Sequence, residues 1–187
     1  MLGSPADVID FMASIMCAQA LWRAVRPPKR RPMAAAADEP IFQGVQFGPW
    51  AATLARFDGH DLVIAIDAST YLTLVFRFQS TSQFRRNFAA ALCAALEDFG
   101  APERTGVLES TVIETATLAW LADRTLLSAL NEVKFFCDLE LGYHTDLRRV
   151  QPNLNDLPRA HRHPCVPAEA VAMRFGGPAA LPAPRTH

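Results

Sequence analysis

The spacing of apolar residues changes once along the chain, and this change constrains the fold more than any motif does. Between residues 50 and 78, short runs rich in Val, Ile, Thr and Phe are separated by Asp-Gly and Asp-Ala-Ser, which favour turns. From residue 84 the apolar residues recur every three or four positions, as they do on one side of a helix. Strands followed by helices predict an α+β fold: a single domain with a small antiparallel β-meander packed against several helices.

The predicted elements follow from these patterns. The three strands are Trp50–Phe57, Leu62–Ile66 and Tyr71–Phe78. The next helix carries an apolar stripe, capped by one of Ser80, Thr81 or Ser82 and ended by Gly100; the stripe comprises Phe84, Phe88, Leu92, Leu96 and Phe99. Phe88 and Leu92 are expected to pack on the sheet.

Further elements are predicted before the first strand and after the helix that ends at Gly100. Ser4 and Pro5 favour a helix start, and helical spacing continues to Val25, before Pro27-Pro28. Thr111–Trp120 leans towards a strand because of its Thr and Val content. Asp123 is a candidate cap for a second long helix that ends at Gly142, with the stripe Leu126, Leu127, Leu130, Val133, Phe136, Cys137 and Leu141. The chain after Gly142 is rich in Pro and Asn up to Pro167 and carries no predicted element there, and Ala168–Phe175 is predicted as a last short helix.

The expected domain comprises residues 17–175 and includes a Pro- and Ala-rich linker at 32–40. Residues 1–16 form an N-terminal extension whose role stays open, and 176–187 are a disordered tail. The apolar stretch 8–25 contains Asp10, Gln19 and Arg23, so it does not match a membrane span. Four cysteines without paired spacing do not suggest a disulfide framework. We therefore expect a cytoplasmic protein without membrane contact.

No nucleophile elbow, phosphate-binding loop or zinc-protease motif is present in the sequence. His161, His163 and Cys165 stand at alternate positions and are acceptable zinc ligands, but the sequence has no second cluster nearby to complete a site. We predict an ordinary loop there, with no metal and no cofactor; a zinc site is the less favoured alternative.

A basic run follows Trp22 and could neutralise phosphates. Its residues are Arg23, Arg26, Lys29, Arg30 and Arg31. The net charge of −1 and the lack of interleaved aromatic residues favour a solvated helix end and linker instead. A face continuous with Arg85, Arg86, Arg148 and Arg149 would favour nucleic-acid binding.

The most interesting single residue is Arg124, which follows the candidate cap Asp123. A helix N-terminus favours anions, and a guanidinium adds a bidentate donor for phosphate or carboxylate. Alternatively, Arg124 pairs with Asp123, Glu114 or the sheet edge and only anchors the helix. Thr125 and Asn131 are the other candidate ligand-binding residues on this helix. Trp50 is a further candidate, although Phe47-Gly48-Pro49-Trp50 reads first as a turn that leads into a strand.

The order of four segments resembles an uncharacterised bacterial family, domain of unknown function 6933. Residues 17–21 (Cys-Ala-Gln-Ala-Leu) resemble its opening Cys-Thr-Lys-Lys-Leu, and 47–51 (Phe-Gly-Pro-Trp-Ala) resemble its Leu-Gly-Asp-Trp-Tyr. Residues 123–131 (Asp-Arg-Thr-Leu-Leu-Ser-Ala-Leu-Asn) resemble its Asn-Arg-Ser-Val-Leu-Gly-Ser-Met-Asn. Residues 155–158 and 167–171 are similar to its closing loop and short helix. The resemblance implies a fold and a bacterial source but no known activity.

Taken together, these features favour a non-catalytic binding or interaction module whose partner is a protein or a small anionic ligand. One alternative is an enzyme of unrecognised type with a pocket near Arg124, lined by Thr125 and Asn131. The other is a nucleic-acid-associated regulator that uses the basic run from Arg23 to Arg31. An exposed apolar patch would favour a protein partner, whereas perturbed titrating groups near Arg124 would favour an enzyme.

Overall fold

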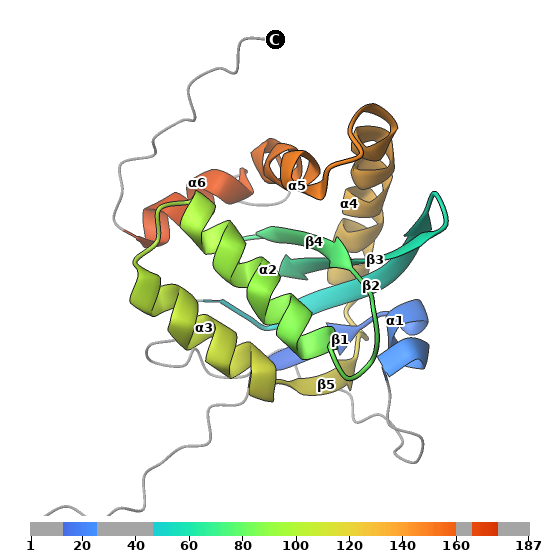
Figure 1. Ribbon diagram of the computed structural model, residues 1–187, viewed down its shortest axis with the longest axis horizontal. Helices are drawn as coiled ribbons and strands as arrows, with labels where there is room; N and C mark the ends of the chain where they lie inside the picture. The colour runs from blue at the N-terminus through green and yellow to red at the C-terminus, as the bar shows by residue number, and fades with distance from the viewer. Residues whose placement is uncertain (1–12, 26–46, 160–165, 176–187) are drawn as a thin grey trace, which may run out of the picture.

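A five-stranded sheet lies at the centre of the molecule, with helices on both of its faces (Figure 1). The computed structural model describes residues 13–25, 47–159 and 166–175. The strands are β1 (Ser14–Cys17), β2 (Trp50–Phe57), β3 (His60–Asp67), β4 (Thr73–Arg77) and β5 (Thr117–Trp120), in the order β4-β3-β2-β1-β5. The α+β domain is therefore confirmed, but the sheet is mixed and not purely an antiparallel meander.

The predicted meander forms one half of this sheet. β2 pairs antiparallel with β3, from Trp50 opposite Asp67 to Phe57 opposite His60, and β3 pairs antiparallel with β4. Asp58 and Gly59 connect β2 to β3 with φ angles of 45° and 77°. Two positive φ angles suit the right-handed twist of a tight hairpin and explain why Asp-Gly stands there.

The other half of the sheet corrects the sequence prediction. β1 lies between β2 and β5 and is parallel to both, so the helix predicted from Ser4 to Val25 is wrong at Ser14–Cys17. All four β1 residues are buried, so the strand shows no alternation of apolar and polar residues. Of the segment Thr111–Trp120, only Thr117–Trp120 is a strand. Both short strands depend on partners distant in sequence, which local spacing does not reveal.

Six helices are found within the described residues. They are α1 (Gln19–Val25), α2 (Phe84–Asp98), α3 (Glu103–Thr115), α4 (Arg124–Tyr143), α5 (Leu147–Asp156) and α6 (Pro167–Arg174). The predicted helices at α2, α4 and α6 are confirmed. Helix α5 was not predicted; it lies in the Pro- and Asn-rich segment after Gly142, and Pro152 stands inside it. Asp123 caps α4 as predicted, but no side chain caps α2 at its N-cap Gln83.

The two faces of the sheet bury separate apolar clusters. On β3, Val63 and Ala65 face the cluster formed by α1, α2 and α3, to which Val171 of α6 also belongs. Leu62, Ile64 and Ile66 face the opposite cluster, formed with α4 and α5. β3 is thus apolar on both sides, as expected for a strand inside a three-layer arrangement.

The open edge of β4 is covered by amide side chains from α5. The side chain of Asn155 accepts a hydrogen bond from the Thr73 backbone N–H (2.7 Å) and donates one to the Thr73 carbonyl (2.9 Å). One helical turn earlier, Gln151 accepts from the Val75 N–H (3.0 Å). These two residues take the place of a neighbouring strand, which protects the edge from pairing with another chain.

We expect Asn155→Ala to lower the free energy of unfolding by about 1–3 kcal/mol, because it leaves buried donor and acceptor groups of Thr73 unpaired. Asn153→Ala on the same helix is the matched control, since it removes one half-buried bond to Glu140. Urea denaturation of both variants measures the difference. Equal losses for the two variants would show that Asn155 does not seal the edge.

Candidate functional site

Helix α4 carries three of the four predicted ligand-binding residues, all on its solvent-facing side. The Asp123 carboxylate fixes the start of the helix by accepting from the backbone N–H groups of Thr125 (2.7 Å) and Leu126 (3.1 Å). Arg124, Thr125 and Asn131 are exposed. The opposite side packs on the sheet through Leu126, Leu130, Val133 and Cys137.

Arg124 makes no hydrogen bond or ion pair with any residue in the described part of the chain. Pairing with Asp123 or Glu114, the anchoring alternative, is therefore not observed. Its binding of an anion stays a prediction.

Trp50, the fourth candidate, lies on the other face of the sheet. It is fully buried, and its ring packs against Phe88 at 5.2 Å and against Phe47 at 6.3 Å between ring centroids. Its Nε1 has no hydrogen-bond partner among the described residues. The sheet separates Trp50 from the outer side of α4, so the four candidates do not form one site.

The outer side of α4 also carries large apolar side chains, which the sequence analysis did not single out as a surface. Their exposed fractions are 39% for Leu127, 60% for Phe135, 46% for Leu139 and 82% for Tyr143. Phe135 also contacts the half-buried Phe136, with 5.5 Å between ring centroids. The sequence contains a signal for this surface, because the apolar residues at positions 135, 139 and 143 fall outside the predicted buried stripe. We call Leu127, Phe135, Leu139 and Tyr143 the α4 outer face.

Charged residues border the α4 outer face on two sides. Lys134 and Asp138 are exposed, one helical turn apart.

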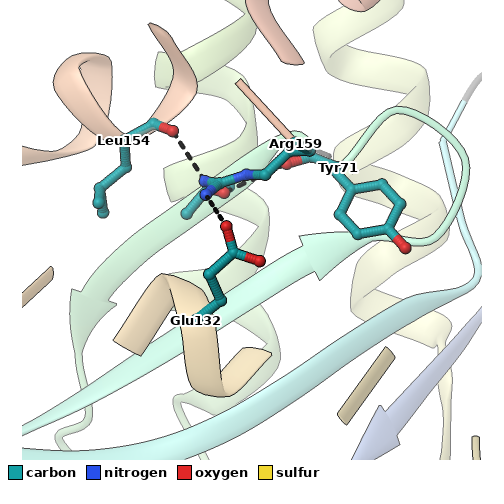
Figure 2. A network of polar contacts seen from close by, with 5 residues as sticks. Tyr71, Glu132, Leu154 and Arg159 are labelled. Atoms are coloured by element: carbon teal, nitrogen blue, oxygen red, sulfur yellow. Dashed lines mark hydrogen bonds and ion pairs between the residues drawn. The ribbon is translucent and has the colours of Figure 1, made fainter. Parts of the chain in front are cut away.

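Glu132, on the side of α5, forms an ion pair with Arg159 (Nη1 to Oε1, 3.7 Å), and Arg159 Nη2 donates to the Leu154 carbonyl at 2.9 Å (Figure 2). Burial lowers the pKa of Arg159, an effect that Glu132 and Tyr71 oppose. The buried guanidinium thus ties the end of α5 to α4 and fixes the helix that presents the face.

A second polar cluster lies at the end of β3. The buried Asp67 carboxylate accepts hydrogen bonds from the Gly48 N–H, from the N–H and Oγ of Ser69, and from the N–H and Oγ1 of Thr70. Arg174 of α6 donates to Ser69 Oγ at 2.6 Å, and its guanidinium lies 5.4 Å from the centre of the Phe47 ring. Five donors occupy the carboxylate, so its role is to hold the two loops together.

Burial makes two cysteine thiols poor nucleophiles. It raises the pKa of the Cys17 thiol to about 12, which the charge of Arg85 partly offsets. It raises the pKa of Cys137 to about 12 as well, assisted by Asp138 and Glu140. Because the thiolate is the reactive form, neither residue is suited to covalent catalysis at neutral pH.

These thiols should make the fold sensitive to alkali. In the unfolded chain both titrate near pH 9, so their contribution to stability is complete below that pH and is lost as pH rises towards 12. Each thiol is expected to remove about 1.4 kcal/mol of unfolding free energy per pH unit in this window. Urea denaturation between pH 8 and 10.5 measures the slope, and Cys137→Ala should reduce it. An unchanged slope in that variant would contradict the assignment.

The remaining predicted residues are separated or lie outside the described ranges. Arg23 is exposed on α1, whereas the other four basic residues of its run and the residues His161, His163 and Cys165 lie outside. The part of the chain that the structure describes contains no group of His, Cys, Asp or Glu that could hold a metal ion. Arg85 and Arg86 belong to α2 and Arg148 and Arg149 to α5, on opposite faces of the sheet. These four do not form one basic face.

Comparison with known protein families supports the resemblance found in the sequence. The model of a family described as a domain of unknown function (DUF6933) matches residues 14–170. The chain belongs to this family. No curated protein matches it. The DUF6933 match begins at Ser14, the first residue of β1, and ends within α6, so it includes all five strands of the described sheet and the whole α4 outer face. Among the described residues no helix is long and apolar enough to cross a membrane.

Proposed function

We propose that this DUF6933 chain is a non-catalytic interaction module and that the α4 outer face is its docking surface. The observation that carries the proposal is the exposure of Phe135, Leu139 and Tyr143 along one side of a helix whose other side is buried on the sheet. Apolar residues gathered on one exposed face are typical of protein contact sites, and aromatic side chains contribute most to binding energy there.

The enzyme alternative has less support. Arg124, Thr125 and Asn131 stand on the outward side of a helix. The described groups with resolved pKa shifts are Cys17, Cys137 and Arg159, and all three are buried. A catalytic site near Arg124 would combine a perturbed group with access to substrate. We therefore favour binding over catalysis.

A cytoplasmic location in a bacterial cell is part of the same proposal. Cys17, Cys93 and Cys137 are free thiols, which suits a reducing compartment. Nucleic-acid binding through the basic run stays the second alternative, because most of that run lies outside the described residues.

Site-specific photo-crosslinking in cells tests the docking surface. A photoreactive phenylalanine analogue replaces Phe135 in one variant and Val107 of α3 in the control, since the two side chains are exposed by 60% and 58%. The proposal predicts a discrete protein adduct from position 135 and none from position 107. If positions 135, 139 and 143 all fail to form an adduct, the outer face does not bind a protein partner.

A further inference from the structure

We propose that the partner bound by the α4 outer face is a second copy of this chain, with the two α4 helices packed antiparallel about a two-fold axis. This inference rests on the proposed function and specifies its partner. In a two-fold contact, residue i of one copy lies opposite residue j of the other, and j lies opposite i. A self-pairing face must therefore carry complementary residues at equal distances from one centre.

The charged residues that border the α4 outer face meet this requirement. Lys134 and Asp138 stand one turn apart on the same flank of the face, and both are exposed. In an antiparallel pair centred near position 136, each Lys134 lies opposite the Asp138 of the other copy. In a parallel pair, the same flank of the two copies would lie on opposite sides of the contact, so Lys134 would not meet the other copy's Asp138.

The apolar residues are symmetric about positions close to the same centre. Phe135 and Leu139 are symmetric about position 137, so each phenylalanine would lie beside the other copy's leucine. Tyr143, the most exposed of the set, and the small exposed Ser128 are symmetric about a point between 135 and 136. The three centres, 135.5, 136 and 137, span 1.5 residues. In a pair centred at position 136, Phe135 is therefore offset from the other copy's Leu139 by about 3 Å along the axis, and Tyr143 from Ser128 by about 1.5 Å, offsets that interdigitating side chains take up. Charged, bulky and small residues are thus compatible with one antiparallel arrangement.

Glu132, the acidic residue on the α5 side of the face, does not take part in these charge pairs between copies. Its carboxylate is paired within the chain with Arg159. The inward residues Leu130 and Val133 are fully buried against the sheet and do not take part. The contact is confined to one helix from each copy, and interfaces of this small size are weak, so we expect a dissociation constant of about micromolar or above.

Charge-swap variants test the arrangement by analytical ultracentrifugation over a concentration series. Lys134→Glu and Asp138→Lys each replace two opposite-charge pairs by two like-charge pairs, and each is expected to weaken the dimer about tenfold. The double variant K134E/D138K restores the pairs and should dimerise like the wild type. An equimolar mixture of the two single variants should form a heterodimer more readily than either associates alone.

Variants that place a charge at an exposed apolar position complete the experiment. Phe135→Asp should abolish the dimer, whereas Val107→Asp on α3 should leave it unchanged. Circular dichroism and urea denaturation confirm that each variant is folded. A wild-type chain that stays monomeric at all concentrations up to about 1 mM would overturn the second-copy partner. A wild-type dimer that the double variant does not restore would overturn the antiparallel arrangement.

Failure of this inference is distinguishable from failure of the proposed function. A monomeric chain whose position 135 crosslinks in cells to a different protein retains the docking surface but has another partner. An adduct of twice the mass of the chain, containing only this protein, supports self-pairing. No adduct and no dimer together would overturn both proposals.

Discussion

Replacing Phe88 by alanine is expected to lower the free energy of unfolding by about 3–5 kcal/mol, because it leaves a cavity in the centre of the larger core. Phe88 is fully buried on α2. Its ring packs edge-on against Trp50, Phe76 and Phe84, with centroids 5.2, 5.6 and 6.1 Å away. Urea denaturation monitored by tryptophan fluorescence measures the loss.

Val107→Ala on α3 is the control for Phe88→Ala, because it truncates an exposed apolar side chain by a similar chemical change. We expect it to change the unfolding free energy by less than about 0.5 kcal/mol. If the Phe88 variant lost no more than this control, Phe88 would not be the contact between α2 and the sheet.

Asp67→Ala is expected to cost at least about 3 kcal/mol, since several buried donors would lose their acceptor together. The donors include the backbone N–H groups of Gly48 and Thr70, which the carboxylate draws to the end of β3. Removing Asp67 would release the loop before β2 from the turn after β3. Thermal and urea denaturation measure the change in stability.

The control for Asp67→Ala is Asp61→Ala on the same strand. Asp61 forms an exposed ion pair with Arg56 at 3.8 Å, which is worth less than about 1 kcal/mol. Comparable losses in the two variants would mean that the Asp67 hydrogen bonds do not organise this corner of the fold.

The predictable part of the fold was the part determined by local spacing. The meander from β2 to β4 and the helices α2 and α4 each carry enough residues to show a period, and Asp58-Gly59 and Asp123 mark their boundaries. β1 and β5 have four residues each and are specified by pairing across the sheet. Helix α5 was missed because Pro152 lies within it, although Asn155 and Gln151 give that helix its function at the sheet edge.

The candidate site was predictable only on the inner side of α4. Leu126, Leu130, Val133 and Cys137 were assigned to the buried stripe and are buried. Leu127 was assigned to the same stripe but is 39% exposed, because one side of a helix can bury only a limited arc against a flat sheet. Phe135, Leu139 and Tyr143 fall outside this stripe by their spacing, but the spacing does not show whether another element of the fold covers them.

If a partner covers the α4 outer face, that face is protected in cells and accessible in dilute purified protein. Ser128→Cys places a thiol on the face without removing its apolar residues, and Val107→Cys places one on α3 as the control. Maleimide labelling, resolved by peptide mass spectrometry, compares cells with dilute purified protein. We predict that Cys at 128 is protected in cells and reactive in dilute protein, whereas Cys at 107 reacts in both. Equal reactivity at position 128 in both settings would show that no partner covers the α4 outer face.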